Sequence, residues 1–424
     1  MIIKPRKSLS GTMKVPGDKS ISHRAIMLGA LAEGTTTIKG FLMGEDCLST
    51  ITCFQKMGVH IDIEDAIVTV EGKGLRGLKK PTSELDVGNS GTTLRLLSGI
   101  LAAQDFECTI TGDDSIKTRP MKRIIEPLLK MGAHITSIND NDRAPLYIKG
   151  STLQNITYHS PVASAQVKSC IMLASLFTEG QSTIIEPVRS RNHSEIMLNV
   201  FGGHIEADGC AITTSPVDQL SATDIIVPGD ISSAAYFMVA GLILEDADIT
   251  IEQVGINPTR DGIIHVLQAM NGNITVFNKR IMNGELVADI RVQSSQLKGT
   301  IIDKPLIPTL IDEIPVIAVA ACFAEGTTLI KDASELRVKE SDRIATMVSE
   351  LTKMHADIQG TEDGMIIHHS PHLIGNDVES YHDHRVAMSL AVAGLAAKGI
   401  TTIHHSDCVD ISFPHFFKLI NGIS

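Results

Sequence analysis

The sequence contains no tryptophan, and aromatic residues make up only 4% of its 424 residues. Proteins that bind bases or sugars by stacking need such rings, so a stacking site is not expected here. Asp and Glu number 49 against 37 Lys and Arg, which gives a formal net charge of −12. A general nucleic-acid-binding protein needs a basic surface to neutralise phosphates, and this balance argues against one. Any basic cluster must be local and would suit a small anion.

Long apolar runs and paired cysteines are also missing. The N-terminus lacks the apolar stretch of about 7–15 residues that a secretory signal requires. Nowhere does the chain approach the roughly 18 uninterrupted apolar residues of a membrane span. The seven cysteines are scattered and form no C-x-x-C pair, so we expect reduced thiols that mostly fill the core. These absences predict a cytoplasmic protein with no membrane partner.

What the chain does have is repetition. Val15–Asp18 reads V-P-G-D, and the same four residues recur at Val227–Asp230, half a chain later. In each half, a polar start leads into a small-residue apolar stretch, a turn and a Thr/Ile-rich segment, and this layout recurs about every 70 residues. Six such units fill the chain, three in each half. Because the chain is also longer than one core usually serves, we expect two domains.

The residue types of each unit predict helices and strands. Six stretches rich in Ala, Leu and Met favour helix and are apolar on nearly all sides, as buried helices are. They are residues 25–32, 94–103, 170–177, 234–244, 315–323 and 386–397. Short β-branched segments such as 35–38, 327–330 and 401–403 predict strands. We therefore predict two similar α/β lobes.

The two V-P-G-D segments predict where the chain crosses between the lobes, because Pro-Gly favours a turn. One lobe would span residues 18–228. The other would combine residues 229–424 with the N-terminal residues 1–17, which complete it.

Polar residues gather at the starts of the six predicted helices. Helix N-termini present unpaired N–H groups and the positive end of the helix dipole, so they attract anions. N-capping is a sufficient explanation for Ser232 and an expected one for Asp18 and Asp230. It does not explain Lys19 or Arg385, because the dipole disfavours a cation there. We expect a bound anion to compensate these two charges.

Further cations lie in loops before predicted outer helices. Arg119 precedes a proline, Arg191 lies in R-S-R-N-H, and Arg337–Arg343 reads R-V-K-E-S-D-R. A solvated surface is the ordinary interpretation of one such charge, but recurrence at equivalent places in several units favours a shared anion site. Arginine suits this role because it binds carboxylate and phosphate with two parallel hydrogen bonds.

Five motifs in series resemble those of the 3-phosphoshikimate 1-carboxyvinyltransferase (EPSP synthase) family. They are Asp18-Lys19-Ser20-x-Ser22-x-Arg24, Gly88-Asn89-Ser90-Gly91-Thr92-Thr93-x-Arg95, Ser164-Ala165-Gln166, Arg337–Arg343 and Asp383-His384-Arg385. The resemblance spans essentially the whole chain, in the expected order. It implies the enolpyruvyl transferase fold, with two lobes of three βαβαββ units around buried parallel helices.

The resemblance implies transfer of the enolpyruvyl group of phosphoenolpyruvate to the 5-hydroxyl of 3-phosphoshikimate, giving 5-enolpyruvylshikimate 3-phosphate and phosphate in the shikimate pathway to chorismate and the aromatic amino acids. The residues implied for 3-phosphoshikimate are Lys19, Ser20, Arg24, Ser164, Ala165, Gln166, Arg191, Asp312 and Lys339. Those implied for phosphoenolpyruvate are Lys19, Gly91, Arg119, Gln166, Arg343 and Arg385. No cofactor and no metal is expected, and a monomer is the default. Since both halves contribute residues, we expect the lobes to close on the substrates.

The implied chemistry is acid–base, without a covalent enzyme intermediate. The methylene carbon of phosphoenolpyruvate gains a proton while the 5-hydroxyl loses one and attacks the neighbouring carbon. The tetrahedral product then expels phosphate as the methylene proton is returned. One carboxylate must therefore face the hydroxyl and a second acid the methylene. We assign Asp312 to the first role and Glu340 to the second, with Lys19 assisting phosphate departure; Asp312 also has an N-cap interpretation.

Two positions depart from the family pattern. Ile411 stands where some members have a Lys before a T/S-F-P segment, and Lys168 or Arg191 are candidates to replace that cation. Leu96 and Leu97 follow Arg95, where many members have a Pro, which could change the tilt of this helix and the tolerance to analogue inhibitors such as glyphosate.

Two other functions stay open. The related enolpyruvyl transferase acting on UDP-N-acetylglucosamine carries Lys-Asn near its start and a catalytic Cys before its Arg-Pro, whereas this chain has Lys19-Ser20 and no Cys in residues 112–120. A non-catalytic anion-binding protein would be expected to lack Asp312 or Glu340, and both are present. The adjacent histidines near residues 382–384 and 404–405 lack zinc-type spacing with a third partner.

Overall fold

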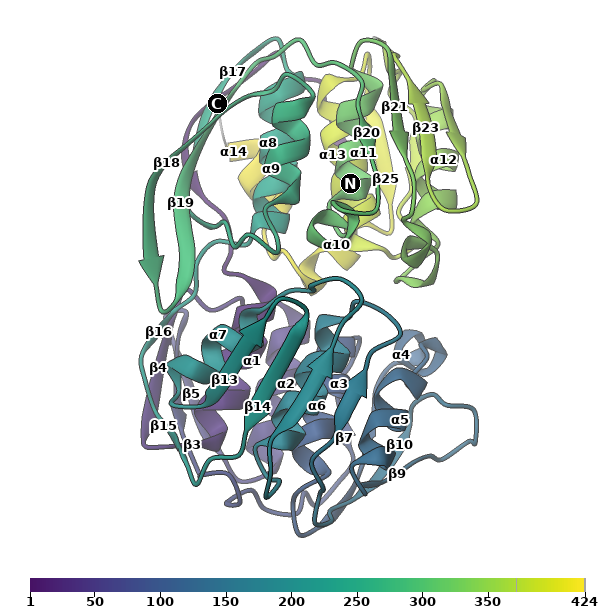
Figure 1. Ribbon diagram of the computed structural model, residues 1–424. Coiled ribbons are helices and arrows are strands. Elements are labelled where there is room, and N and C mark those ends of the chain that lie inside the picture. The colour runs from purple at the N-terminus through teal and green to yellow at the C-terminus, as the bar shows by residue number, and fades with distance from the viewer. Residues whose placement is uncertain (371, 423–424) are drawn as a thin grey trace. The chain divides into compact units, whose positions relative to one another are not determined.

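The structure is a computed structural model that describes residues 1–370 and 372–422 (Figure 1). The chain divides into two compact units, each with its own hydrophobic core. Unit 1 joins Met1–Pro16 to Pro228–Ile281 and Leu286–Ser424, and unit 2 joins Gly17–Val227 to the tetrapeptide Met282–Glu285.

Unit 2 is built from helices and small mixed sheets. Its helices are α1 (Lys19–Leu31), α2 (Glu45–Lys56), α3 (Gly91–Leu101), α4 (Asp114–Thr118), α5 (Lys122–Lys130), α6 (Ala165–Ser175) and α7 (His193–Val200). Its strands are β3 (Ala32–Glu33), β4 (Thr35–Lys39), β5 (His60–Glu64), β6 (Ile67–Glu71), β7 (Leu85–Asp86), β8 (Glu107–Thr111), β9 (His134–Ser137), β10 (Leu146–Lys149), β11 (Thr157–His159), β12 (Ser182–Ile185), β13 (His204–Asp208), β14 (Ala211–Ser215), β15 (Leu220–Ser221) and β16 (Ile225–Ile226). They form three four-stranded sheets, in the orders β16-β4-β6-β5, β7-β8-β10-β9 and β11-β12-β14-β13, and the pair β15-β3.

Unit 1 repeats this plan. Its helices are α8 (Ile231–Ile243), α9 (Gly262–Ala269), α10 (Ile307–Leu310), α11 (Ile314–Cys322), α12 (Arg343–Lys353), α13 (His384–Ala396) and α14 (Phe416–Gly422), with 3-10 turns η1 (Ser334–Val338) and η2 (Ser406–Ile411). Its strands are β1 (Ile2–Ile3), β2 (Ser8–Lys14), β17 (Asp246–Gly255), β18 (Asn273–Met282), β19 (Glu285–Gln293), β20 (Ile301–Ile302), β21 (Thr327–Ile330), β22 (Ile358–Gly360), β23 (Met365–His368), β24 (Asp377–Glu379) and β25 (Thr401–His404). The sheet orders are β18-β19-β17-β2, β20-β21-β23-β22 and β1-β25-β24.

Three helices run through the core of each unit, as the apolar stretches predict. In unit 1, α8, α11 and α13 contact one another, and in unit 2, α3 packs between α1 and α6 (Figure 1). Every residue of α8 from Ile231 to Leu242 is buried, because its Ala, Met and Phe side chains leave no polar face for solvent. The helices α2, α5 and α12 instead have one apolar face and cover the sheets.

One sheet in each unit is completed by a strand that is distant in sequence from its neighbour. β2 pairs in parallel with β17, so the N-terminal segment completes a sheet of unit 1. β16, which ends the long segment of unit 2, pairs in parallel with β4. Other parallel pairs, such as β7 with β8, are joined through one of the buried helices. The chain therefore passes between units at the two V-P-G-D segments because each unit needs one strand from beyond its own repeats.

Two further features bear on the sequence expectations. The seven cysteines are all free, and six of them are buried. Among the described helices, none combines the length and the apolar character that a membrane crossing needs.

Candidate active site

In unit 2, side-chain hydrogen bonds join the N-terminal ends of the buried helices. Arg24 of α1 donates to Ser169 of α6 at 2.8 Å. Gln166 of α6 donates to Thr92 of α3 at 3.0 Å, and Arg95 of α3 donates to the amide oxygen of Gln166. Asp18, Ser90 and Ser164 cap α1, α3 and α6 through their side chains. The polar starts that the sequence predicts therefore meet at one end of this unit.

Two arginines lie close to the start of α3 at Gly91. Arg119 donates to Asn89 Oδ1 at 2.6 Å. A Cβ atom added at Gly91 would lie 3.3 Å from Nη1 of both Arg119 and Arg95. Since both neighbours are cationic and the helix start adds unpaired N–H groups, the absence of a side chain at Gly91 leaves an electropositive space.

Arg24 is a buried cation whose hydrogen bonds go to uncharged oxygens. Besides Ser169, it donates to Ser194 Oγ at 2.6 Å and to the carbonyl oxygen of Ser20 at 2.9 Å. Burial lowers the pKa of Arg24 to about 10, and the positive charge of Arg191 acts in the same direction, while Glu195 and Asp18 raise it. An anion bound beside Arg24 would relieve this cost.

Lys19 is compensated differently from the expectation. Its ammonium group forms an ion pair with Asp46, near the start of α2. The cation at the start of α1 is thus balanced by a protein carboxylate, so the inference that it requires a bound anion is wrong.

Lys168 is also paired within the protein. Its ammonium group is buried and lies 2.8 Å from Glu186 Oε2 and 2.8 Å from Glu195 Oε1. Such a cation is held away from solvent, so Lys168 does not offer the free charge that would replace a Lys at position 411. Ile411 itself packs against the hydrophobic core of unit 1. Of the two candidates to replace the cation missing at position 411, Arg191 remains.

In unit 1, the corresponding helix starts meet around Asp312, which directly precedes Glu313 and α11. Its carboxylate faces four cations: Lys339 Nζ at 3.3 Å, Arg343 Nη1 at 3.5 Å, Arg260 Nη1 at 3.7 Å and Arg385 Nη2 at 3.9 Å. Asp312 does not cap the helix, because α11 begins after Glu313 without a side-chain cap. The N-cap interpretation of Asp312 is therefore wrong, and its position among cations is the feature to explain.

Arg343 lies at the centre of a second group of charges. It donates from Nε to Asp383 Oδ2 at 2.8 Å and from Nη2 to Glu340 Oε2 at 2.6 Å. Burial opposes its charge, but Asp383 and Glu340 outweigh burial and raise the pKa of Arg343 above its usual value. For Asp383, burial is likewise outweighed by Arg343, which holds the pKa of this carboxyl below its usual range.

Arg385 follows the same pattern as Lys19. Its Nη1 donates to the carbonyl oxygen of Asp312 at 3.0 Å and lies 3.8 Å from Glu313 Oε1. Although burial opposes the charge, Asp312 and Glu313 raise the pKa of Arg385. Because protein carboxylates compensate Arg385, a bound anion is not needed to balance its charge, contrary to the expectation from sequence.

The N-cap interpretation of Ser232 is also wrong. Asp230 caps α8, and the Ser232 hydroxyl donates to Glu313 instead.

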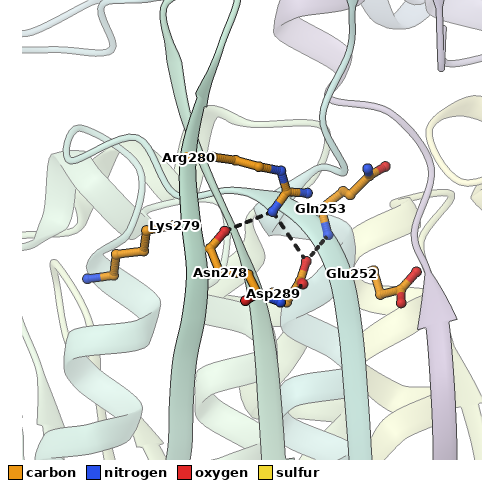
Figure 2. A pocket seen from close by; sticks show the side chains of 6 residues that line it. All are labelled: Glu252, Gln253, Asn278, Lys279, Arg280 and Asp289. Atoms are coloured by element: carbon orange, nitrogen blue, oxygen red, sulfur yellow. Dashed lines mark hydrogen bonds and ion pairs between the residues drawn. The ribbon is translucent and has the colours of Figure 1, made fainter.

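Unit 1 also carries a polar pocket of about 500 Å³ on β17, β18 and β19, separate from the helix starts (Figure 2). Arg280 lies 3.7 Å from Asp289 and donates to the carbonyl oxygen of Asn278 at 2.8 Å, so its charge is already engaged. The residues that line it are Glu252, Gln253, Asn278, Lys279, Arg280 and Asp289. None of the candidate site residues belongs to this lining.

Sequence analysis missed one arginine of the unit 1 site. Arg260 lies two residues before α9, as Arg191 lies two residues before α7 and Arg119 three before α5. The internal repeat was thus the signal that could have found it.

The fold and the charged helix starts define the class of protein. The chain is similar throughout its length to the enolpyruvyl transferase NikO of Streptomyces tendae, with a TM-score of 0.80, covering 100% of this chain and 96% of that one. At 16% identity this likeness shows the fold alone. The predicted α/β fold class of the enolpyruvyl transferases is confirmed.

The family follows from closer similarities. The model of the EPSP synthase (3-phosphoshikimate 1-carboxyvinyltransferase) family matches residues 3–420. The 3-phosphoshikimate 1-carboxyvinyltransferase of Thermoanaerobacter sp. (strain X514) is 57% identical over 98% of both chains, and that of Desulforamulus reducens is 51% identical over 100% of this chain and 99% of the relative. The EPSP synthase structure from Acinetobacter baumannii is 47% identical, with a TM-score of 0.90 over 100% of this chain and 97% of that one. The chain belongs to the EPSP synthase family, as its motifs predict.

Proposed function

We propose that this chain carries out the reaction of its family, with the helix starts of its two units as the reacting site. The enolpyruvyl group of phosphoenolpyruvate is transferred to the 5-hydroxyl of 3-phosphoshikimate, and phosphate is released. The observation that carries the proposal is the family match over residues 3–420, which includes every residue assigned below. Both substrates carry a phosphate and a carboxylate, and the clusters of cations at the helix starts suit such anions.

The residues proposed for 3-phosphoshikimate come from both units. They are Lys19, Ser20, Arg24, Ser164, Ala165, Gln166, Arg191, Asp312 and Lys339. Four contribute cationic groups, and Ser20, Ser164 and Gln166 contribute uncharged groups that hydrogen-bond hydroxyls and oxyanions. Burial of Arg24 among hydroxyl groups supports this assignment, because its hydrogen bonds to Ser194, Ser20 and Ser169 go to uncharged oxygens and a dianionic phosphate would offset its charge.

The residues proposed for phosphoenolpyruvate are Lys19, Gly91, Arg119, Gln166, Arg343 and Arg385. The space between Arg119 and Arg95 at Gly91 supports this assignment in unit 2. In unit 1, Arg343 and Arg385 both lie within 4 Å of Asp312, so an anion that contacts them would also be near the proposed base.

The proton transfers are assigned to two carboxylates of unit 1. Asp312 takes the proton of the 5-hydroxyl as its oxygen forms a bond to C2 of phosphoenolpyruvate, and Glu340 delivers a proton to C3. The resulting tetrahedral intermediate loses the C3 proton to Glu340 as the C2–O bond to phosphate breaks, and Lys19 stabilises the departing phosphate. Asp312 returns its proton to the medium, so the enzyme ends each cycle unchanged.

The contact between Glu340 and Arg343 fits this double role. At 2.6 Å the guanidinium stabilises the carboxylate form, which is the form that removes a proton in the second step. The first step needs the acid form. An anionic substrate that contacts Arg343 would weaken its hold on Glu340 and so favour protonation.

We also propose that residues 18–228 and residues 1–17 with 229–424 act as the two functional lobes. The protein is proposed to work as a monomer in the cytoplasm, where its free cysteines stay reduced. The net charge of −12 supports small anions rather than nucleic acids as partners.

The test is a phosphate-release assay with the purified protein. We expect phosphate from phosphoenolpyruvate when 3-phosphoshikimate is present and none when either substrate is omitted. Release of phosphate with UDP-N-acetylglucosamine as the acceptor would instead assign the chain to the reaction of the related enolpyruvyl transferase. Binding of both substrates without release would support a non-catalytic anion-binding protein instead.

A further inference from the structure

Arg260 occupies a rigid turn between β17 and α9. Its backbone N–H donates to the carbonyl oxygen of Asn257 at 2.7 Å, and the Asn257 side chain accepts hydrogen bonds from the N–H and the hydroxyl of Thr259, at 2.9 and 2.8 Å. Only 3% of Arg260 is exposed. The backbone that presents this guanidinium is therefore fixed by its own turn.

The guanidinium of Arg260 joins the starts of two buried helices. Nη2 donates to Ser232 Oγ of α8 at 2.5 Å and lies 3.4 Å from Glu313 Oε1, next to α11. Nη1 lies 3.7 Å from Asp312 Oδ2. A planar fork can reach neighbouring carboxylates in this way, whereas the single ammonium of a lysine cannot keep both contacts.

Glu313 is the buried counterpart of Arg260. Its side chain is fully buried, accepts the hydroxyl hydrogen of Ser232 and lies 3.8 Å from Arg385 Nη1. Its other oxygen, Oε2, has no hydrogen-bond partner among the described residues. Glu313 is thus held between Arg260 and Arg385, two of the three arginines that face Asp312.

This arrangement is costly if stability is its only purpose. Taking several charges out of water is expensive, and well-packed apolar residues often stabilise a core equally well or better. These particular buried charges lie where the proposed base and a proposed phosphoenolpyruvate contact lie. A role in orienting these two groups accounts for that location.

We propose that Arg260 is a positioning residue that, with Glu313, holds the Asp312 carboxylate and the Arg385 guanidinium in the geometry used for transfer. This inference rests on the proposed role of Asp312 as the base for the 5-hydroxyl. Arg260 acts through Asp312 in two ways: it fixes the direction of the carboxylate, and its charge favours the ionised form that accepts a proton.

The test compares Arg260→Gln and Arg260→Lys with wild type by kcat and KM from about pH 5.5 to about pH 9. We expect Arg260→Gln to lower kcat roughly 10- to 100-fold and to move the acidic limb of the kcat profile to higher pH, because Asp312 loses a nearby cation. Arg260→Lys keeps the charge, so it should leave the limb in place while lowering kcat about 10-fold. Arg291→Gln, which removes an exposed arginine paired with Asp248 in the same unit, is the matched control and should match wild type.

A double-mutant cycle with Asp312→Asn separates the possible failures. If Arg260 acts through Asp312, adding Arg260→Gln to Asp312→Asn should lower kcat by less than twofold more. If Arg260→Gln lowered kcat by the same factor in wild type and in Asp312→Asn, the inference would be overturned. The base role of Asp312 would then remain intact. Full activity of Asp312→Asn would overturn the base role and the inference together.

The cycle is complemented by the lysine variant. Wild-type kcat in Arg260→Lys, or an unshifted acidic limb in a folded Arg260→Gln, would also contradict the inference. If Arg260→Gln fails to fold, the kcat of Arg260→Lys tests the inference instead. A kcat about 10-fold below wild type would support the inference, and a wild-type kcat would overturn it.

Discussion

Arginines at the helix starts of unit 2 donate to uncharged oxygens, whereas those of unit 1 lie against carboxylates. Arg119 donates to the amide oxygen of Asn89, while Arg343 donates to Asp383 and Glu340. Hydrogen bonds to neutral groups do not offset the charge of a guanidinium. A cation paired with a carboxylate instead fixes the direction and charge of that carboxylate. The same repeated architecture thus gives these arginines neutral oxygen partners in one unit and carboxylate partners in the other.

The largest expected effect removes the proposed base from unit 1. Asp312→Asn should lower kcat by roughly 10³-fold, because the 5-hydroxyl loses its proton acceptor. Affinity for 3-phosphoshikimate should not weaken, since the four neighbouring cations lose a competing carboxylate. Phosphate release and titration calorimetry measure the two quantities.

The control for this experiment is Asp248→Asn, at an exposed aspartate paired with Arg291. It should leave both quantities unchanged. A loss of affinity in Asp312→Asn that matches the loss of kcat would mean that unit 1 serves binding as much as proton transfer.

The second prediction concerns Lys168, a buried cation of unit 2 that lies between two carboxylates. Lys168→Met leaves Glu186 and Glu195 buried without their cation and should lower the free energy of unfolding by about 3–5 kcal/mol. KM for phosphoenolpyruvate should stay near the wild-type value. Urea denaturation and steady-state kinetics provide the measurements.

Lys80→Met is the comparison variant, because Lys80 forms an exposed ion pair with Glu107 at 3.2 Å and should matter little to stability. Unchanged stability with a raised KM in Lys168→Met would show that Lys168 does supply the cation missing at Ile411.

A third variant fills the space at the start of α3. The added Cβ of Gly91→Ala would lie 3.3 Å from two guanidinium nitrogens, so it should raise KM for phosphoenolpyruvate about 10-fold, or about 1.4 kcal/mol. At saturating phosphoenolpyruvate, kcat should change little. Gly360→Ala, whose Cβ would make ordinary 3.6 Å contacts, should have no effect on KM. An unchanged KM in Gly91→Ala would place the substrate elsewhere.

The smallest effect is a pH dependence of stability in unit 2. His23 is buried beside Thr50, and burial, followed by the charges of Lys19 and Arg24, holds the pKa of His23 well below its usual value. The unfolded chain binds this proton below about pH 6.5 and the folded chain does not, so stability falls as the pH drops, by at most about 1.4 kcal/mol per pH unit. His23→Gln should flatten the decline of the urea midpoint between about pH 6.5 and 5.5. An identical decline in both proteins would show that His23 is not its source.

The sequence was sufficient for the architecture because its signals are local and repeated. The stretch 234–244 is apolar on all sides, and it matches α8, which is buried from Ile231 to Leu242. The V-P-G-D turns predict where the chain crosses, and the pairing of β2 with β17 gives the physical reason.

Charge pairing was less accessible from sequence because it depends on contacts between distant residues. Nothing near Lys19 in sequence indicates Asp46 as its partner, and nothing near Arg385 indicates Glu313. A cation at a helix start does have a compensating anion, as the helix dipole predicts, but that anion is a carboxylate of the protein. Ser232 was misassigned for the same reason, since its partner Glu313 lies 81 residues away.

The proton transfer proposed for the carboxylates of unit 1 can be tested most directly by isotope incorporation. The reaction is run in D₂O with saturating substrates, and deuterium in the methylene group of the product is measured by mass spectrometry. Delivery of a proton to C3 by Glu340 predicts incorporation in the wild type and in Gly91→Ala, and its loss in Glu340→Gln. Wild-type incorporation in Glu340→Gln would contradict the account.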